Sequence, residues 1–554
     1  MDGELTVHGP HTIDDTHSIQ EVRMLDAHTN RTFRHSAAAP RLVLVLALVV
    51  FALGSVMAQG NVVRFALAVE PGSLDLYADT TTASLDVNQA IYETLVRFDH
   101  DMNIVPWLAT SWEQVDATTY RFDLREGVSF HSGNPFDAQA VKAHVDRVND
   151  PAQPGLPRAF LNHIQEVVVL DEYRVEFRLS REFGPTLAYL ALPHTAVMDA
   201  AEADAIGDAF GVRPSGTGPF RMDSWSRGSA LNLVANADYW GGAPAVDGLQ
   251  FRIIPEPGPR TLALQSGEIH VTNQVSIQDI PSLQANPNVD VEVAPEPRYI
   301  RWLVNLNDPI LGDINVRRAL TMAIDYGLVV DAILGEFGSL LEGFVIPDSI
   351  GYLAVPYTYD PEAAADLLEE SGWVRNASGL FERDGQVLRI PMMTGNKMPR
   401  ELELFEAIQG QFRDFGIDMT IDLIEGAQIY PNIARFSDMK GTDQVPDFGL
   451  LTMDGGMRTG EAENGLQSAF LCQGNRNASH YCNEEYDRLL AVAVSGAPDE
   501  ERVEAYHAAQ RILADEIPAI NIWQPSWAIA TNVALDGYRL HPAGVWHYEA
   551  ISLR

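Results

Sequence analysis

The stretch LELFEAIQGQFRDFGIDMTIDLI, residues 402–424, contains a helix pattern, a glycine and a strand pattern in succession. Its first part predicts a helix, because apolar residues recur at the spacing that gathers them on one face: Leu402, Phe405, Ile408, Phe412 and Phe415. Gly416 then predicts the end of that helix. In residues 417–424 apolar and polar residues alternate through Leu423, which is typical of a strand with one buried face. A helix followed at once by a strand indicates a mixed α/β fold.

Further helices and strands of the same kind are predicted along the chain. EYRVEFRLS, residues 172–180, alternates as a strand with its apolar residues facing inward. Residues 315–327 have helical spacing, and Asn315 is placed to cap that helix. Asp360, Pro361 and Gly372 have the positions of a cap, a first helical residue and a terminator for a third helix. These elements predict a compact α/β protein with more than one lobe.

The stretch YRFDLREGVSFHSGNPF, residues 120–136, concentrates acidic, basic, hydroxyl and imidazole side chains as a catalytic site does. Its apolar residues nevertheless alternate with polar ones over residues 118–124, which predicts a half-buried strand. The alternation resumes at residues 128–130 after a turn, and Asp137 then caps a helix. We therefore predict a hairpin whose polar residues face solvent, rather than a catalytic centre.

The composition bounds the class of protein. The chain has 554 residues, enough for two or three domains, and 46% hydrophobic and 21% charged residues are ordinary for a globular protein. The net charge of −38 makes nucleic acid and anionic lipid poor candidate partners. Lysine occurs only at Lys142, Lys397 and Lys440, none of them in the Gly-Lys-Ser/Thr context of a P-loop. The chain is therefore not itself a P-loop ATPase.

The first 58 residues have the pattern of a secretory signal peptide. Arginines precede an apolar run over residues 42–53, and Val56 and Ala58 satisfy the small-residue rule for cleavage. A membrane anchor is the alternative, but it needs a run of about 20 residues. We expect cleavage near Ala58, with Met24 as an alternative start, and a mature chain that is soluble in the periplasm.

Two cysteines, Cys472 and Cys482, lie in one polar segment. In an exported protein such a close pair favours a disulfide that closes a small loop. A zinc site is the alternative, but His480 between the cysteines supplies a third ligand and no fourth lies nearby.

The common catalytic signatures do not occur in the sequence. There is no G-x-S-x-G, no H-E-x-x-H and no G-x-G-x-x-G after a strand. With 76 acidic residues, chance carboxylate pairs are certain, so a secreted carboxylate-dependent hydrolase stays open as an alternative. We expect a protein that is not an enzyme and that uses neither a cofactor nor a metal ion.

Eight segments in colinear order resemble one protein family. They are EPGSLDLY (70–77), YETLVRFD (92–99), PWLATSWE (106–113), FDAQAVKAHVDRV (136–148), GTGPFRMDSW (216–225), ADYWGGAPAVDGLQFRIIPEPGPRTLALQSGEIHV (237–271), VNLNDPILGDINVRRALTMAID (304–325) and YDPEAAADLLEESGW (359–373). The set resembles the family 5 extracytoplasmic solute-binding proteins of ABC importers, the cluster of dipeptide, oligopeptide and nickel binders. The similarity spans most of residues 61–554.

The resemblance implies a bilobal periplasmic-binding-protein fold (type II, cluster C-like) with an extra subdomain on the first lobe. We expect the first lobe over residues 59–272, with the subdomain around 94–205. The second lobe is expected over 273–522, and residues 523–554 return to the first. The crossing strands are expected near residues 271–275 and 520–523.

The resemblance also implies a solute site between the lobes. In peptide binders of this family an aspartate in an Asp-Pro-rich loop meets the amino terminus of the ligand. The matching segment, residues 446–464, lacks Asp-Pro but contains Asp454 and Arg458. The helix that begins near Arg400 lacks the arginine expected to meet a peptide carboxylate, unless Lys397 or Arg400 takes its place. These departures put ordinary dipeptide specificity in doubt.

Three more residues are candidate contacts by the same resemblance. Trp302 and Asn305 belong to a segment expected to border the cleft, where Trp302 either stacks on the solute or packs in the core. His194 stands where nickel binders have an arginine, and a surface histidine is the alternative.

We therefore expect the periplasmic component of an ABC importer. It would capture a peptide or peptide-like solute by lobe closure and deliver it unaltered to the membrane permease, as a monomer. A nickel-chelate, oligosaccharide or opine binder of the same family is the alternative.

Overall fold

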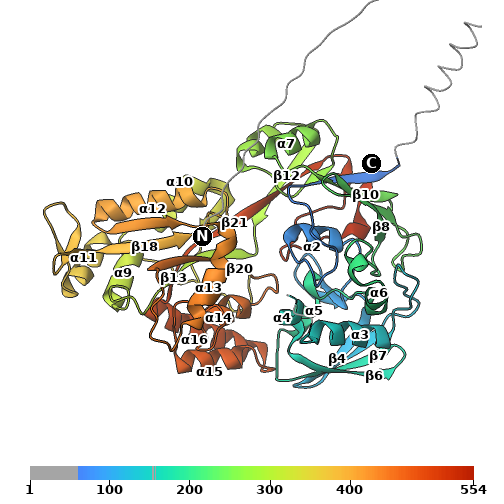
Figure 1. Ribbon diagram of the computed structural model, residues 1–554, viewed down its shortest axis with the longest axis horizontal. Helices are drawn as coiled ribbons and strands as arrows, with labels where there is room; N and C mark the ends of the chain where they lie inside the picture. Colours follow the sequence, from blue (N-terminus) through green and yellow to red (C-terminus); the bar gives the residue numbers. More distant parts are fainter. Residues whose placement is uncertain (1–59, 153–154, 156) are drawn as a thin grey trace, which may run out of the picture. The chain divides into compact units, whose positions relative to one another are not determined.

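The strand β21 (Ala519–Asn532) belongs to two sections of one 12-stranded sheet. Its first half pairs with β13 (Arg298–Val304), and its second half pairs with β12 (Val289–Pro295) and β11 (Val271–Thr272). β21 therefore joins the two sections, as Figure 1 shows. The computed structural model describes residues 60–152, 155 and 157–554, so the predicted signal peptide lies outside the described residues.

The first section has the strand order β8-β9-β10-β1-β11-β21. Its strand β1 (Val62–Leu67) is parallel to β10 (Gly248–Ile253) and β11, and the hairpin of β8 (Phe220–Ser226) and β9 (Ala230–Ala235) forms its edge. Val63, Phe65 and Phe251 are buried in the core of this section, together with residues of the C-terminal segment such as Tyr548.

The second section has the order β19-β18-β20-β13-β21. Its strand β18 (Arg389–Thr394) is parallel to both β19 (Asp418–Leu423) and β20 (Leu450–Gly456), whereas β13 is antiparallel to β20. The helices α9 (Ile314–Met322), α10 (Tyr326–Leu334) and α12 (Glu401–Phe415) pack their apolar faces on this sheet.

Other elements lie outside these strand orders, and among them β14 belongs to the sheet because it pairs with β21. They are α2 (Thr82–Asn88), β2 (Val96–Phe98), β3 (Ile104–Pro106), α4 (Pro157–Leu161), α5 (Thr186–Leu190), α6 (Ala200–Ile206), α7 (Pro257–Gln265), α8 (Ile280–Gln284), β14 (Gly338–Leu340), α11 (Pro361–Glu370), β15 (Val374–Arg375), β16 (Phe381–Arg383), β17 (Gln386–Val387), α13 (Ile429–Asp438), α14 (Glu463–Phe470), α15 (Glu484–Ala493), α16 (Asp499–Glu516), β22 (Leu535–Asp536) and β23 (Ser552–Leu553).

The predicted helix–glycine–strand unit is confirmed as α12, Gly416 and β19. Gly416 has a φ of 108°, a conformation that glycine adopts without strain. Two details of the apolar pattern were wrong. Leu404 rather than Leu402 is fully buried, and Leu423 is 53% exposed. The exposure of Leu423 follows from its place at the end of an edge strand that pairs only with β18.

The polar stretch of residues 120–136 is structural. Its strand β5 (Thr119–Leu124) lies between β4 (Ala109–Asp116) and β7 (Arg174–Leu179) in a four-stranded sheet completed by β6 (Ile164–Asp171). The predicted hairpin was wrong, because residues 128–130 make only an isolated bridge from Ser129 to Pro135. On the outer face of the sheet, Arg121 pairs with Glu176 at 3.1 Å and Asp123 with Arg174 at 2.7 Å.

Two predicted helix starts are confirmed and one was wrong. Asp137 accepts a hydrogen bond from the Ala140 amide at the start of α3 (Ala138–Asn149), and Asp360 accepts one from the Ala363 amide at the start of α11. The helix α9 is capped by Asp313 instead of Asn315, since Asp313 accepts a hydrogen bond from the Asn315 amide at 2.9 Å.

The four-stranded sheet shares a hydrophobic core with the second section. One cluster of buried residues contains Phe122 and Phe177 of that sheet together with Leu466 of α14 and Tyr506 of α16. The backbone amide of Gly184 also donates to the Val494 carbonyl at 2.9 Å. In this structure residues Gly60–Arg554 therefore form one compact unit.

Candidate functional site

Arg458 lies where residues of the two sheet sections meet. It follows β20 in the second section, and its Nη1 donates to the carbonyl of Ala543, in the C-terminal segment, at 3.4 Å. Gly544 has a φ of 68°, and a side chain at that position would collide with the Arg458 guanidinium and the Trp527 ring. Burial lowers the pKa of Arg458, yet a guanidinium stays charged at neutral pH.

Two carboxylates attract Arg458 without forming an ion pair with it. Asp86 and Glu296 attract the guanidinium, and neither is within ion-pair distance of it. Asp86, near the end of α2, accepts hydrogen bonds from Trp546 Nε1 at 2.8 Å and from Asn273 Nδ2 at 3.4 Å. Burial raises the pKa of Asp86 to about 6. A charged guanidinium therefore stands at the junction with no carboxylate bound to it.

Asp454, in contrast, is saturated by cations. Its Oδ1 accepts from Lys397 Nζ at 2.6 Å, and its Oδ2 accepts from Arg298 Nη1 at 3.1 Å. Arg298 also pairs with Glu296 at 2.8 Å, and the Lys397 ammonium lies 4.4 Å from the centre of the Tyr430 ring. Each oxygen of the Asp454 carboxylate is therefore already bonded to a cationic side chain of the protein.

A cavity opens beside this junction. It encloses about 940 Å³, its open mouth included. Both chain crossings line it, through Pro295 and Pro297 on one side and Gln524 and Trp527 on the other. Its remaining walls come from both sections, with His100, Glu292 and His541 from the first and Asp348, Met457 and Gly460 from the second. A solute in this cavity contacts both sections at once.

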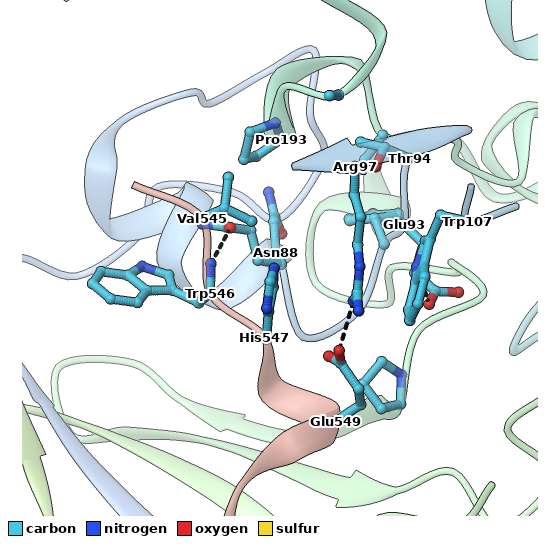
Figure 2. Close-up of a pocket in the computed structure, with 15 residues that line it drawn as sticks. Asn88, Glu93, Thr94, Arg97, Trp107, Pro193, Val545, Trp546, His547 and Glu549 are labelled. Carbon is cyan, nitrogen blue, oxygen red and sulfur yellow. Dashed lines mark hydrogen bonds and ion pairs between the residues drawn. The ribbon is translucent and has the colours of Figure 1, made fainter. Parts of the chain in front are cut away.

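A second pocket is lined only by residues of the first section and its C-terminal segment. Figure 2 shows Arg97 facing Asn88 and His547 across it. Arg97 pairs with Glu549 at 2.6 Å, and its guanidinium lies 3.3 Å from the centre of the Trp107 ring. Trp546, which also lines this pocket, is the residue that donates to Asp86, so the pocket adjoins the Arg458 junction.

The arrangement of a cavity between two sheet sections joined by two crossing segments has a clear match among known proteins. The family model described as bacterial extracellular solute-binding proteins, family 5, matches residues 103–477, which is more than half of the chain. The chain belongs to family 5 of the bacterial extracellular solute-binding proteins.

Two known proteins are similar to this solute-binding protein over most of its length. The glutathione-binding protein GsiB of Escherichia coli strain K12 is 27% identical over 493 residues, which cover 87% of this chain and 92% of that protein. The structure of HbpA2 from Haemophilus parasuis matches with a TM-score of 0.77 at 23% identity and covers 89% of this chain and 100% of that one.

A third match is DppA from Helicobacter pylori, a periplasmic binding protein associated with an ABC transporter and solved with the peptide STSA. It is 25% identical, with a TM-score of 0.73 over 89% of this chain and 98% of that one. The family and these relatives are solute-binding proteins of ABC importers rather than enzymes.

The predicted contacts of the solute-binding protein lie in different surroundings. Trp302 is fully buried and packs on Phe405 with ring centres 5.2 Å apart, and Asn305 donates to the carbonyls of Pro446 and Phe448. Arg400 forms an ion pair with Glu403 on the surface of α12. These three residues have structural partners, whereas Lys397, Asp454 and Arg458 lie near the junction.

His194 is buried rather than on the surface. Its ring lies 4.8 Å from that of Phe160, its Nδ1 has no hydrogen-bond partner in the protein, and burial lowers its pKa to about 3. Cys472 and Cys482 form a disulfide. Among the described residues, no group of three or more His, Cys, Asp or Glu side chains has an arrangement suited to a metal ion.

Sequence reasoning missed Asp86, Asn88, Asn273 and Trp546. Asp86 and Asn88 lie in a segment with the pattern of an ordinary short helix. The hydrogen-bond partners of Asp86 lie more than 180 residues away in the sequence, and the Asn88 side chain has no hydrogen-bond partner among the described residues.

In the part of the chain that the structure describes, none of the helices is both long and apolar enough to cross a bilayer.

Proposed function

We propose that this solute-binding protein captures a peptide or peptide-like solute that presents a carboxylate to Arg458. The solute is captured in the periplasm after removal of the signal peptide, and the monomeric chain delivers it to the membrane permease. The relatives that bind glutathione and a short peptide support a solute of this class.

The guanidinium of Arg458 is the observation that carries this proposal. Arg458 is partly buried, and a cation in that position without a bound counter-ion is unfavourable, because part of its hydration is lost and no ion pair replaces it. A carboxylate of the solute supplies the missing partner with charge-assisted hydrogen bonds. Asp454 forms no ion pair with this guanidinium and is bonded to Lys397 and Arg298 instead.

Closure follows from the same contacts. We propose that the lobes meet at residues 295–298 and 524–526, between β12 and β13 and in the middle of β21. The first crossing then lies after residues 271–275, since β12 still pairs with the second half of β21. A solute that binds Arg458 from one lobe and the C-terminal segment from the other stabilises the closed arrangement.

Binding of free and amidated peptides tests the proposal. Glutathione and trialanine, each with a free or an amidated C-terminal carboxylate, are titrated calorimetrically into the mature chain, residues 59–554. We expect the free acid to bind at least tenfold more tightly, because a hydrogen bond to a charged group contributes about 1.5–3 kcal/mol. Arg458→Gln should remove this preference, and Arg413→Gln, an exposed position on α12, should leave it intact.

Native mass spectrometry of freshly purified protein complements the titration. A retained mass that corresponds to an acidic peptide supports the proposal. A retained nickel chelate or sugar, or recovery of cleaved peptide after incubation with the mature chain, would contradict it.

A further inference from the structure

The cavity between the two sheet sections is lined by two carboxylates and by no lysine or arginine among the described residues. Glu292 lines it from β12 in the first section, and Asp348 lines it from the loop after β14 in the second. Both side chains are exposed, so a solute in the cavity can reach them. Negative charge therefore enters the same space from both sections, and no basic side chain in the lining offsets it.

The other polar side chains of the cavity add no positive charge that balances these carboxylates. Gln524 is 6% exposed, and its Nε2 donates to a backbone carbonyl at 2.9 Å, so the group that its amide offers a solute is the acceptor Oε1. Burial lowers the pKa of His541 to about 4, and both its ring nitrogens are bonded to backbone groups. Ser349 and His100 each offer a group that can donate or accept. The cavity is therefore rich in acceptors.

The walls between these polar groups are apolar. Trp527, Leu540, Met457, Ile346 and Pro297 all line the cavity. An alkyl chain that packs on such side chains is removed from water, as are the stems of lysine and arginine on apolar protein surfaces. The face of a tryptophan ring also attracts a cation. The space therefore suits an apolar stem that ends in a positive charge.

We propose that this cavity receives a basic side chain of the solute, with its stem along the apolar wall and its cationic head at Glu292 and Asp348. This inference rests on the proposed function, because it specifies another part of the solute whose carboxylate binds Arg458. An ammonium or guanidinium head offers only donors, which match the two carboxylates and Gln524 Oε1. Its hydrogen bonds to the carboxylates are charge-assisted.

The charge of the solute then governs closure. In the closed arrangement Glu292 and Asp348 line one cavity from opposite sections, and like charges repel. A cationic side chain between them replaces this repulsion with attraction, whereas an acidic side chain adds to it. Because a ligand shifts a conformational equilibrium only by its differential interaction with the two states, a basic side chain favours closure most.

The cavity begins next to the Arg458 guanidinium. Met457, which lines the cavity, directly precedes Arg458, and Pro542, also in the lining, directly precedes Ala543, whose carbonyl Arg458 binds. Neighbouring Cα atoms are about 3.8 Å apart. The carboxylate and the basic side chain can therefore belong to the same residue of a peptide or to adjacent ones.

Butylguanidinium and its neutral isostere butylurea test the cavity without knowledge of the solute. Each is titrated calorimetrically into the mature chain, residues 59–554. We expect butylguanidinium to bind at least about fivefold more tightly, since it gains two partly exposed ion pairs. The preference should shrink between about 0.01 M and about 1 M NaCl, because salt screens exposed charges. Equal affinities at low salt, or no binding of butylguanidinium, would overturn the proposal.

Asp348→Asn and Glu292→Gln are the variants. Asparagine tolerates the φ of 64° at Asp348, and glutamine retains an oxygen for the Leu540 amide that Glu292 binds at 3.1 Å. We expect each substitution to reduce the preference for butylguanidinium at least about twofold, and the double variant to abolish it.

Asp384→Asn is the matched control for these variants. Asp384 is also exposed, has a φ of 54° and lies between β16 and β17, outside the cavity. This substitution should leave the preference for butylguanidinium intact. A preference that survives in the folded double variant, or that falls equally in the control, contradicts the role of Glu292 and Asp348.

Dipeptides separate this proposal from the proposed function. The parent chain should bind alanyl-arginine at least about fivefold more tightly than alanyl-citrulline, its neutral isostere, and the double variant should bind both alike. Arg458→Gln should weaken both dipeptides and leave the preference for butylguanidinium intact. Failure of both dipeptides to bind the parent, with butylguanidinium still preferred, contradicts the peptide assignment alone. Equal affinities for both dipeptides contradict the basic side-chain subsite alone.

Acetylated dipeptides show which positive charge the cavity binds. N-acetyl-alanyl-arginine keeps the guanidinium and lacks the terminal ammonium, so its preference over N-acetyl-alanyl-citrulline should persist. Loss of the preference on acetylation would assign the two carboxylates to the amino terminus and overturn the proposal. A peptide without a basic residue, if retained in native mass spectrometry, would contradict the subsite while it supports the proposed function.

Discussion

Glu93 explains why several of the separate sequence motifs occur together. Its carboxyl group accepts hydrogen bonds from Trp107 and Trp240, both at 2.8 Å, from Tyr239 at 2.6 Å and from Thr217 at 2.7 Å. These donors come from segments separated by up to about 150 residues of chain. A single buried residue therefore connects four of the motifs that resemble family 5.

The stability of the protein should depend on the protonation of Glu93. Burial raises the pKa of this residue from 4.5 to about 7. A raised folded-state pKa means that protonation favours the folded state. This contribution, roughly 3 kcal/mol, is complete below pH 4.5 and is lost as the pH rises through 7. Urea unfolding from pH 4.5 to 8 should show this loss in the parent chain and not in Glu93→Gln.

A matched substitution controls for changes elsewhere. Glu113→Gln alters a side chain that is 70% exposed, so its pH profile should follow that of the parent. Glu93→Gln should also lower the free energy of unfolding by about 1–3 kcal/mol at low pH. Donors point at both oxygens of Glu93, and the NH2 group that replaces one oxygen in glutamine cannot accept their hydrogen bonds. Parallel profiles for all three proteins would contradict the role of Glu93.

At the scale of elements, the turn after residue 543 positions Arg458. Gly544 has a φ of 68°, and its missing side chain leaves the space that the guanidinium and the Trp527 ring occupy. Ala543, before it, accepts the hydrogen bond from Arg458, and Val545, after it, lines the pocket of Figure 2.

Gly544→Ala should therefore impair binding more than folding. We expect it to displace Arg458 and to weaken carboxylate-bearing peptides at least tenfold by calorimetry. Gly228→Ala is the control, because Gly228 has a φ of 71° and nothing within 4 Å of an added side chain. The backbone strain is then similar in both variants. Equal binding losses in the two variants would show that strain, rather than the displaced arginine, is responsible.

At the scale of the whole molecule, we expect the lobes to rotate about the two crossing segments. Contacts such as that of Gly184 with Val494 and that of Arg458 with Ala543 lie beyond these crossings and join residues from either side of them. Hinge closure of this kind requires only a few residues at the crossings to change conformation.

X-ray scattering should detect the closure. We expect the radius of gyration of the mature chain to fall on saturation with a bound free-acid peptide, towards the value calculated from this structure. Arg458→Gln at the same peptide concentration should keep the larger value. A radius that does not change at verified saturation would contradict capture by closure.

Local features of the fold were predictable because their energies depend on neighbours within about four residues. Examples are the caps Asp137 and Asp360 and the terminator Gly416. The errors arose where longer-range contacts decide. Residues 128–130 alternate as a strand, yet β5 already has β4 and β7 as neighbours. Longer-range contacts also decide between the two places that the sequence left open for Trp302, which packs in the core.

The sequence by itself therefore determined the α/β class, the family and the approximate place of Arg458, because periodicity, capping and colinear motifs are written along the chain. Only the tertiary structure decided which charges meet. It pairs Lys397 and Arg298 with Asp454, leaves Arg458 without a bound carboxylate, and brings Asn88 to His547 from positions more than 450 residues apart. Hydrogen bonds and ion pairs depend on distances in space, and folding brings together residues that the linear order separates.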